Sequence, residues 1–222
     1  MSVKGFTGVI LAGGENKRMP VPKAFIEING GKIIERNLKI MKDLFGEIFI
    51  VTNTPELYVY LGVPMLGDIY PLKGPMTGIF TSLINSKNPW VFISACDMPF
   101  INKELILYMT SKTEGCDAVV PKFRKNIEPL FGLYSKQLAS DMEKAILAGN
   151  TGLQDFLCQK MVKFITEREI KNFDPDGRSF INLNTPEDIQ REKGGRNVWY
   201  WNDRVDNNSG NRACNLWSVT TS

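Results

Sequence analysis

The stretch VILAGGENKRMPVPKAF, residues 9–25, joins an apolar run to two glycines and then to a basic segment. The apolar run predicts a buried strand that ends at Gly13 and Gly14. Glycine lets the backbone turn and lets a ligand come close, and backbone N–H groups exposed at such a turn attract phosphate. The stretch therefore predicts either a phosphate-binding loop at the end of a strand or an ordinary glycine turn before a solvated basic loop.

Three basic residues follow the glycines. Arg18 and Lys23 are the stronger candidates for holding a polyphosphate, and Lys17 is the weaker one because such a loop aims only some of its charges inward. Pro20 and Pro22 stiffen the loop and remove two amide donors. Two known phosphate-binding patterns, G-x-x-x-x-G-K-[ST] and G-x-G-x-x-G, are absent, which argues against P-loop NTPases and Rossmann dehydrogenases.

Strands and helices are predicted to alternate along most of the chain. This order indicates a layered α/β domain with a mostly parallel sheet. The predicted strands are 8–14, 47–53, 64–68, 90–97, 116–123, 128–135 and 161–167. The predicted helices are 32–45, 76–85, 102–112, 137–149 and 185–193. Asn102 is predicted to cap the start of the third helix and Gly149 to end the fourth. Thr185, directly before Pro186, is predicted to cap the start of the last helix.

In such sheets, ligands bind beyond the carboxyl ends of the strands. Besides the two glycines, the residues at these ends are Asn53, Asp68 and Asp97. Asp97 follows the hydrophobic strand WVFISA, where an acid is costly unless it has a role; it is predicted either to bind a metal ion or to cap the following turn. Asp68 and Asn53 are either nucleotide contacts or ordinary turn residues.

Composition narrows the class of protein. The 222 residues are 43% hydrophobic and 23% charged, with a net charge of +3, which is typical of a globular protein and not of a general polyanion binder. No apolar run is long enough to span a bilayer and no signal peptide is visible, so we expect a cytoplasmic protein with no membrane or nucleic-acid partner. The absence of histidine excludes Ser-His-Asp triads, Cys-His dyads and histidine-ligated metals.

The chain is expected to have one domain, residues 1–193, followed by a tail. Residues 194–222 hold three of the four tryptophans but show no clear period. We interpret them as an irregular, disordered or non-native extension, with an aromatic lid as the less favoured alternative. The four cysteines are scattered, which indicates reduced and mostly buried thiols and no zinc site.

Four segments together resemble the molybdenum cofactor guanylyltransferase family, the MobA-like nucleotidyltransferases. The segments are LAGG with Arg18-Met19 and Lys23, GPMTGIFTSL (74–83), ISACDMPF (93–100) and NLNTPEDI (182–189), and the resemblance covers about residues 6–192. Each is weak alone, but their order and spacing are specific. The chain departs from the family where Pro20 and Pro22 replace the common Gly and Asp.

The resemblance implies a Rossmann-like, glycosyltransferase-A-like fold and a Mg²⁺-dependent transfer of GMP from GTP to molybdopterin, with release of pyrophosphate. It implies catalytic roles for Arg18, Lys23 and Asp97, with Asp97 as the metal ligand. The nucleotide- and cofactor-binding residues it implies are Leu11, Ala12, Gly13, Gly14, Lys23, Asn53, Asp68, Gly74, Pro75, Gly78, Asp97, Asn182 and Asn184. A phosphate nucleophile is already anionic, so the lack of histidine is no obstacle.

Some alternatives stay open. Asn182 and Asn184 flank Leu183 and share one face of an extended segment. Their functional interpretation is that they bind the pterin-bearing phosphate or complete the metal environment. Their structural interpretation is that they form a turn and the cap of the following helix. A GTP-binding helper protein and molybdoenzyme apoproteins or chaperones are possible protein partners implied by the family. The alternative functions are a CTP-dependent molybdopterin or sugar-phosphate cytidylyltransferase and a non-catalytic GTP-binding carrier module.

Overall fold

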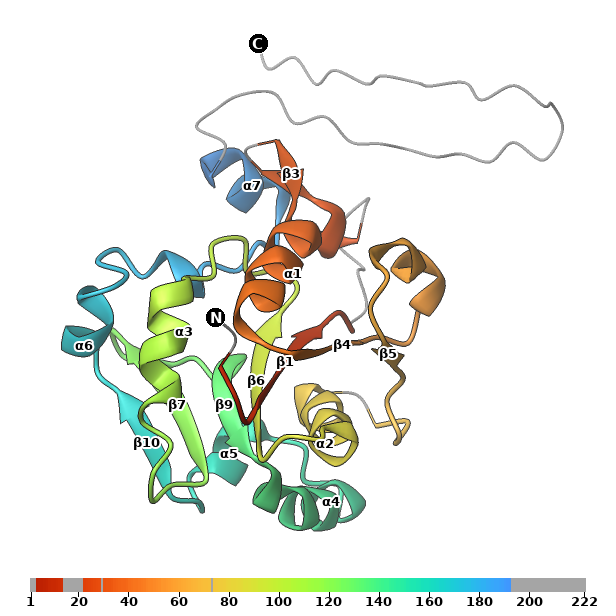
Figure 1. The fold of residues 1–222 in the computed structure, drawn as a ribbon, viewed down its shortest axis with the longest axis vertical. Coiled ribbons are helices and arrows are strands. Elements are labelled where there is room, and N and C mark those ends of the chain that lie inside the picture. The colour runs from red at the N-terminus through yellow and green to blue at the C-terminus, as the bar shows by residue number, and fades with distance from the viewer. Residues whose placement is uncertain (1–2, 14–21, 29, 73, 193–222) are drawn as a thin grey trace, which may run out of the picture.

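The fold is a three-layer α/β sandwich (Figure 1). It is seen in a computed structural model that describes residues 3–13, 22–28, 30–72 and 74–192. Residues 194–222, including Cys214, lie outside the described residues, so the proposed boundary of the domain stays a prediction. No helix in the described part of the chain is long and apolar enough to cross a membrane.

One twisted sheet forms the middle layer. Its strand order is β10-β7-β9-β6-β1-β4-β5, and β8 pairs with β7. The strands are β1 (Phe6–Leu11), β4 (Glu47–Val51), β5 (Met65–Leu66), β6 (Trp90–Ala95), β7 (Ala118–Phe123), β8 (Asn126–Ile127), β9 (Phe131–Ser135) and β10 (Val162–Ile165). A separate small hairpin pairs β2 (Glu27–Ile28) with β3 (Gly31–Lys32).

The predicted parallel core is confirmed for β6, β1, β4 and β5, which are parallel neighbours, and β10 is parallel to β7. The exception is β9, which is antiparallel to both β6 and β7. It follows β7 through the short β8 hairpin and not through a helix, so the chain reverses direction instead of crossing over. The sheet is therefore mixed and mostly parallel.

Helices cover both faces of the sheet. They are α1 (Ile33–Leu44), α2 (Pro75–Asn85), α3 (Lys103–Thr110), α4 (Ala139–Leu147), α5 (Leu153–Leu157), α6 (Glu167–Lys171) and α7 (Pro186–Glu192). Short 3₁₀ turns are η1 (Lys23–Phe25), η2 (Pro55–Leu57), η3 (Val59–Leu61), η4 (Lys136–Leu138) and η5 (Arg178–Phe180). Helices α5 and α6 were not predicted from the sequence.

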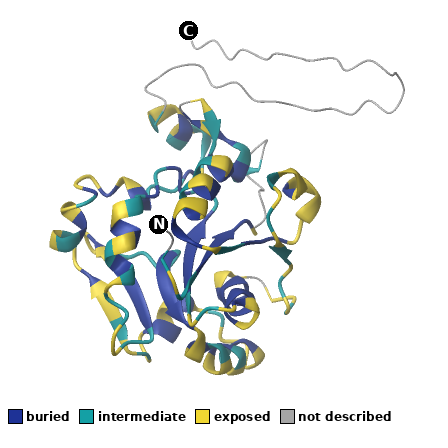
Figure 2. Ribbon diagram, in the orientation of Figure 1, coloured by how far each residue is buried: buried dark blue, intermediate teal, exposed yellow. Residues whose placement is uncertain are grey.

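Alternation along the strands builds two cores. Ile10 on β1 and Phe92 on β6 face a cluster with α1 and α3, whereas Val9 and Ile93 face a second cluster with α2, α4 and α5. Successive strand residues point to opposite faces, so both faces of these strands are apolar and buried. Figure 2 shows the sheet as the buried centre of the molecule, with exposed residues concentrated on the outer helices and loops.

The predicted caps are confirmed. The Asn102 side chain accepts a hydrogen bond from Leu105 N, Gly149 adopts a positive φ of 78° after α4, and Thr185 Oγ1 accepts one from Asp188 N at 3.2 Å. The cysteines differ from expectation, because Cys158 is exposed and Cys96 and Cys116 are only half-buried.

Candidate active site

The predicted ligand side of the sheet is the edge where β1, β4, β5 and β6 end. Gly13 lies exposed just after β1, and Asn53, Asp68 and Asp97 lie just after β4, β5 and β6. Parallel neighbours end at the same edge, so these residues are brought to one side of the molecule. Gly14, Lys17 and Arg18 fall in 14–21, outside the described residues, and their roles stay predictions.

Lys23, Asp97 and Asn184 form one polar cluster. Lys23 Nζ lies 3.1 Å from Asp97 Oδ2 and donates to Asn184 Oδ1 at 2.5 Å. The Lys23 and Asp97 side chains are only 23% and 18% exposed, so their charges are partly shielded from solvent. Three residues that are far apart in the chain therefore meet at the end of β6.

Local packing places Lys23. Pro22, at φ −55°, sets the entry to η1, and Phe25 N donates to Pro22 O at 2.9 Å. The Phe25 ring stacks on Tyr58 with centroids 5.3 Å apart, which anchors η1 to the β4–β5 connection. Pro22 therefore does not prevent Lys23 from reaching the site.

A small third core brings Asn184 to the same place. It joins Ile26, Ile28 and Ile33 near the β2–β3 hairpin to Leu183 and Ile189 at α7. Leu183 N also donates to Asp97 O at 3.1 Å, which fastens the 182–184 segment to the end of β6. Of the alternatives left open for Asn184, the helix cap is excluded, because Thr185 caps α7 and the Asn184 side chain accepts a hydrogen bond from Lys23.

Asn182 lies apart from this contact. Its Nδ2 is 3.5 Å from Phe180 O, and its side chain is half-buried. A role for Asn182 in binding the pterin-bearing phosphate stays a prediction.

Asn53 and Asp68 form a reciprocal pair across the ends of β4 and β5. Asn53 Nδ2 donates to Asp68 Oδ2 at 2.9 Å, and Asp68 N donates to Asn53 Oδ1 at 3.0 Å. The other carboxylate oxygen, Asp68 Oδ1, is buried and has no hydrogen-bond partner in the described part of the chain. The pair thus holds one acceptor oxygen for which no residue of the described ranges supplies a donor.

Helix α2 approaches this pair closely. A methyl group added at Gly78 would lie 3.2 Å from Leu11 Cδ2 and 3.6 Å from Asp68 Oδ1, so a residue without a side chain suits the position. Gly74, at φ 143°, precedes Pro75 at the first position of α2, and both are exposed. The GPMTG segment therefore brings the start of α2 to the Asp68 carboxylate.

One contact was missed by the sequence analysis. The loop between α4 and α5 reaches the start of α2, where a Cβ on Gly74 would lie 3.8 Å from Thr151 Cβ. The flanking glycines Gly149 and Gly152 mark a tight loop, but nothing in the sequence says which element the loop meets.

The donor set fits a magnesium ion bound together with a nucleotide. No group of three or more His, Cys, Asp or Glu side chains gathers anywhere in the described ranges, so an all-protein metal cage is absent there. Mg²⁺ commonly takes one or two carboxylates and fills its remaining positions with substrate phosphates and water. The Asp97 carboxylate and the Asn184 amide oxygen, now joined through a lysine ammonium, are hard oxygen donors of this kind.

The Cys96 thiol is poorly suited to act as a nucleophile. Burial, followed by the charge of Asp97, raises the pKa of its thiol to about 12. The thiol therefore stays protonated near neutral pH, and a covalent cysteine intermediate is not supported.

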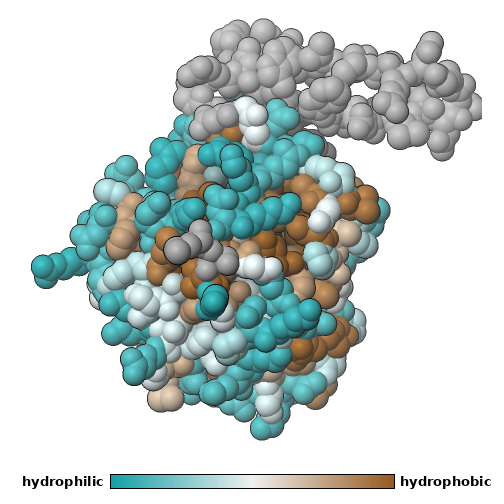
Figure 3. Space-filling view, viewed as in Figure 1, coloured by the Kyte–Doolittle hydropathy of each residue, from teal (hydrophilic) through white to brown (hydrophobic). Residues whose placement is uncertain are grey.

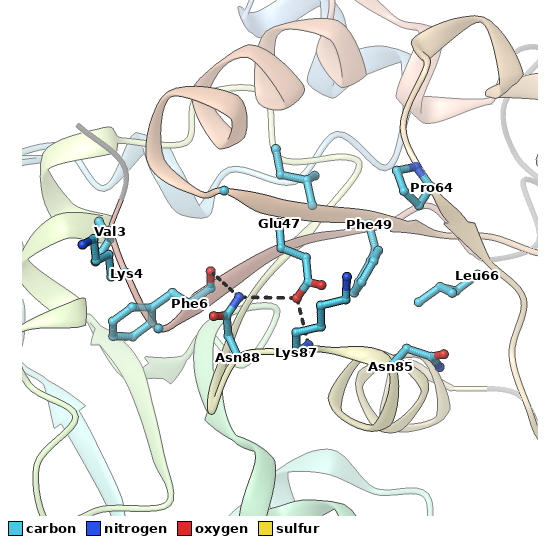
Figure 4. Close-up of a pocket in the computed structure, with 13 residues that line it drawn as sticks. Val3, Lys4, Phe6, Glu47, Phe49, Pro64, Leu66, Asn85, Lys87 and Asn88 are labelled. Atoms are coloured by element: carbon cyan, nitrogen blue, oxygen red, sulfur yellow. Dashed lines mark hydrogen bonds between the residues drawn. The ribbon is translucent and has the colours of Figure 1, made fainter.

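A groove of about 760 Å³ lies at the opposite edge of the sheet, near the start of β1 and β4 (Figure 4). Its Glu47 carboxylate accepts hydrogen bonds from Lys87 N and Asn88 Nδ2. The Glu47 carboxylate thus already has hydrogen-bond partners within the protein, whereas Asp68 Oδ1 at the carboxyl edge has none among the described residues.

The sheet is mixed and mostly parallel, and its carboxyl edge carries Lys23, Asp97 and the start of α2 after Gly74. These features together define a nucleotidyltransferase-type site. The family model of the MobA-like NTP transferase domain matches residues 8–163. The chain belongs to this family of nucleotidyltransferases.

Similar proteins agree with this assignment. A probable molybdenum cofactor guanylyltransferase of Clostridium perfringens is 36% identical over 84% of this chain and 97% of its own length. The molybdenum cofactor guanylyltransferase of Syntrophotalea carbinolica is 35% identical over 83% of this chain and 89% of its own. The crystal structure of molybdopterin-guanine dinucleotide biosynthesis protein A from Archaeoglobus fulgidus matches with a TM-score of 0.74 and 26% identity, covering 85% of this chain and 97% of that one.

Proposed function

We propose that this chain is a molybdenum cofactor guanylyltransferase, which transfers GMP from GTP to molybdopterin and releases pyrophosphate. The observation that carries the proposal is the Lys23–Asp97–Asn184 cluster at the end of β6, in a chain similar over most of its length to proteins of that name.

The reaction is one displacement at phosphorus. An oxygen of the terminal phosphate of molybdopterin attacks the α-phosphorus of GTP and forms a new P–O bond. The bond from the α-phosphorus to the α,β-bridging oxygen breaks, and its electron pair leaves with pyrophosphate. Because the nucleophile is already an anion, the protein has to neutralise charge and align the reactants, and it needs no general base.

The residues divide this work. Lys23, which is hydrogen-bonded to Asp97 and Asn184, is positioned to turn to the triphosphate. Asp97 would hold Mg²⁺, with the Asn184 amide oxygen next to it. When bound, the ion neutralises charge on the phosphates and on the leaving pyrophosphate.

The Asn53–Asp68 pair is suited to recognise the nucleoside. Asp68 Oδ1, which has no partner among the described residues, can accept N–H or O–H donors, and the guanine edge and the ribose both offer these. The start of α2 at Gly74, Pro75 and Gly78 would form the adjoining wall. We assign the nucleoside to this side of the site and the triphosphate to the Lys23 side.

The substrates GTP and molybdopterin follow from this proposal. A cytoplasmic location, a GTP-binding helper protein, and molybdoenzyme apoproteins or chaperones as recipients stay predictions of the sequence analysis.

Nucleotide selectivity tests the proposal. Purified protein, with Mg²⁺ and molybdopterin, is given GTP, CTP, ATP or UTP, and pyrophosphate release and the dinucleotide product are measured. We expect turnover with GTP; turnover only with CTP would place the protein with cytidylyltransferases, and GTP binding without pyrophosphate would indicate a carrier.

Asp97→Asn should lower kcat by at least about a hundredfold, because an interaction at the reacting phosphates is lost. Asp117→Asn is the matched control, since Asp117 precedes β7 at the opposite edge and accepts from Met161 N. Normal turnover of Asp97→Asn would overturn the assignment of the metal.

A further inference from the structure

Asn37 is a fully buried polar residue on the apolar face of α1. Its exposed fraction is 0%, and its neighbours on that face are Ile34, Leu38 and Met41. The helical spacing predicts a hydrophobic residue at this position. A buried amide in such a place calls for a specific partner.

The partner is the loop that carries Asp97. Asn37 Nδ2 donates to the backbone oxygen of Met98 at 2.9 Å, one residue beyond Asp97. The preceding backbone oxygen, that of Asp97 itself, accepts from Leu183 N at 3.1 Å. The two consecutive carbonyls of Asp97 and Met98 are therefore held by two separate elements, the 182–184 segment and α1.

The Asn37 amide is only partly satisfied by hydrogen bonds. Its Oδ1 is buried and has no hydrogen-bond partner within the described ranges. An unpaired buried oxygen costs free energy, and leucine, which branches at the same carbon, would fill similar space without it. The bond from Nδ2 to Met98 is what distinguishes asparagine from leucine at this position.

We infer that Asn37 is a positioning residue for the reaction, which fixes the peptide after Asp97 and so aims the Asp97 carboxylate at the metal. The inference rests on the proposed function, because it assumes that Asp97 binds the ion. Asn37 touches neither substrate nor metal and acts only through the backbone of Met98.

The test separates a positioning role from a structural one. Mn²⁺ is used as a paramagnetic probe, and its binding to the complex of protein and GTP is followed by electron paramagnetic resonance. The variants are Asn37→Leu, which removes the donor and keeps the shape, and Asn37→Ala, which carries the test if the leucine variant does not fold.

Thr7→Val is the matched control. Thr7 is also fully buried and polar, and its Oγ1 donates to Glu47 Oε2 at 2.6 Å, but it lies at the amino end of β1, away from Asp97. Urea unfolding of each variant measures the change in stability separately.

We expect Asn37→Leu and Asn37→Ala to weaken Mn²⁺ binding to the GTP complex about tenfold, the lower end of the effect typical for outer-shell partners of metal ligands. Metal-free GTP binding should stay unchanged, and so should Mn²⁺ binding by Thr7→Val. Unchanged Mn²⁺ binding in both Asn37 variants, or equal weakening in Thr7→Val, would overturn the inference.

Asp97→Asn serves as the reference that keeps the two proposals apart. If Asp97→Asn leaves Mn²⁺ binding to the GTP complex intact, the metal assignment itself fails. If Asp97→Asn weakens it and the Asn37 variants do not, only the positioning role fails.

Discussion

Replacing Lys23 with methionine should change the affinities for metal and for GTP in opposite directions. The Lys23 ammonium is hydrogen-bonded to both Asp97 Oδ2 and Asn184 Oδ1, the two oxygens that we assign to Mg²⁺. The ammonium thus competes with the ion for the same oxygens. Lys23→Met removes the competitor but also removes the cation that the triphosphate needs.

The magnitudes follow from the geometry. At 3.1 Å the Lys23–Asp97 attraction is about 5 kcal/mol with an effective dielectric constant of about 20. Desolvation of both charges and ordering of the lysine chain leave about 1 kcal/mol net for such a part-buried pair. Metal affinity of the nucleotide-free variant should therefore rise about fivefold. Loss of a charged hydrogen bond to phosphate, about 1.5–3 kcal/mol, should weaken GTP binding roughly tenfold to a hundredfold.

Two titrations measure these effects. Free Mn²⁺ is followed by electron paramagnetic resonance without nucleotide, and GTP binding is measured by calorimetry without metal. Lys163→Met, at an exposed lysine on β10, controls for the lost charge. If Lys23→Met binds Mn²⁺ no more tightly than the wild type, Lys23 does not occupy the metal's oxygens and the reasoning fails.

Three further predictions concern stability, measured by urea unfolding. Gly177→Ala should lower the free energy of unfolding by about 2–4 kcal/mol, because Gly177 has φ 68° and a Cβ there would lie 2.2 Å from Phe123 Cε1. A decrease of less than about 0.5 kcal/mol would contradict this reasoning. Burial raises the pKa of Glu128 to about 6, so ionisation of Glu128 destabilises the folded protein as the pH rises from 4.5 to 6. Glu128→Gln should therefore raise the free energy of unfolding by about 1 kcal/mol at pH 8 and leave it unchanged at pH 4. Burial opposes ionisation of Glu169, but hydrogen bonds from Thr166 and Tyr108 prevail and lower its pKa to about 2. Glu169→Gln should therefore lower the free energy of unfolding at pH 7, and this loss should shrink as the pH falls from 4.5 towards 2. A loss that does not depend on pH would be inconsistent with this.

The sequence predicted the layers of the fold because each depends on local periodicity. Ile10 and Val9 alternate between two cores, and Leu38 and Met41 follow a helical spacing. It failed at α6, where the strand was predicted to run to Glu167. The structure ends β10 at Ile165 and starts a helix with a capping box between Thr166 and Glu169. That pattern can be read in the sequence, but the preceding apolar run obscured it.

The site was predictable where residues follow strands and unpredictable where they meet across the chain. Asp97 and Asp68 were located by the rule for carboxyl ends of parallel strands. The contact of Lys23 with Asn184 joins residues 161 positions apart, and it depends on how the third core packs. No single-sequence pattern encodes that packing, nor the choice of Asn37 as the partner of Met98.

One of the exposed apolar areas of the described surface lies beside the segment that carries Lys23. Figure 3 shows a mainly hydrophilic face with apolar residues on the side where η3 and β5 lie in Figure 1, and Val59 and Tyr60 on η3 are 66% and 52% exposed. Tyr60 also packs with Phe25 and Lys32, so this area borders the segment that carries Lys23.

The bond between Leu183 and Asp97 has a consequence for how the protein is made. Synthesis runs from the N-terminus, and the whole sheet is encoded by the time the ribosome passes Ile165. At that stage Lys23 and Asp97 are present, but the carbonyl of Asp97 lacks its donor and Lys23 lacks Asn184. A nascent chain, or a fragment cut after β10, would therefore have the strands of the sheet but an incomplete site. The site can be complete only after the 182–184 segment has been synthesised.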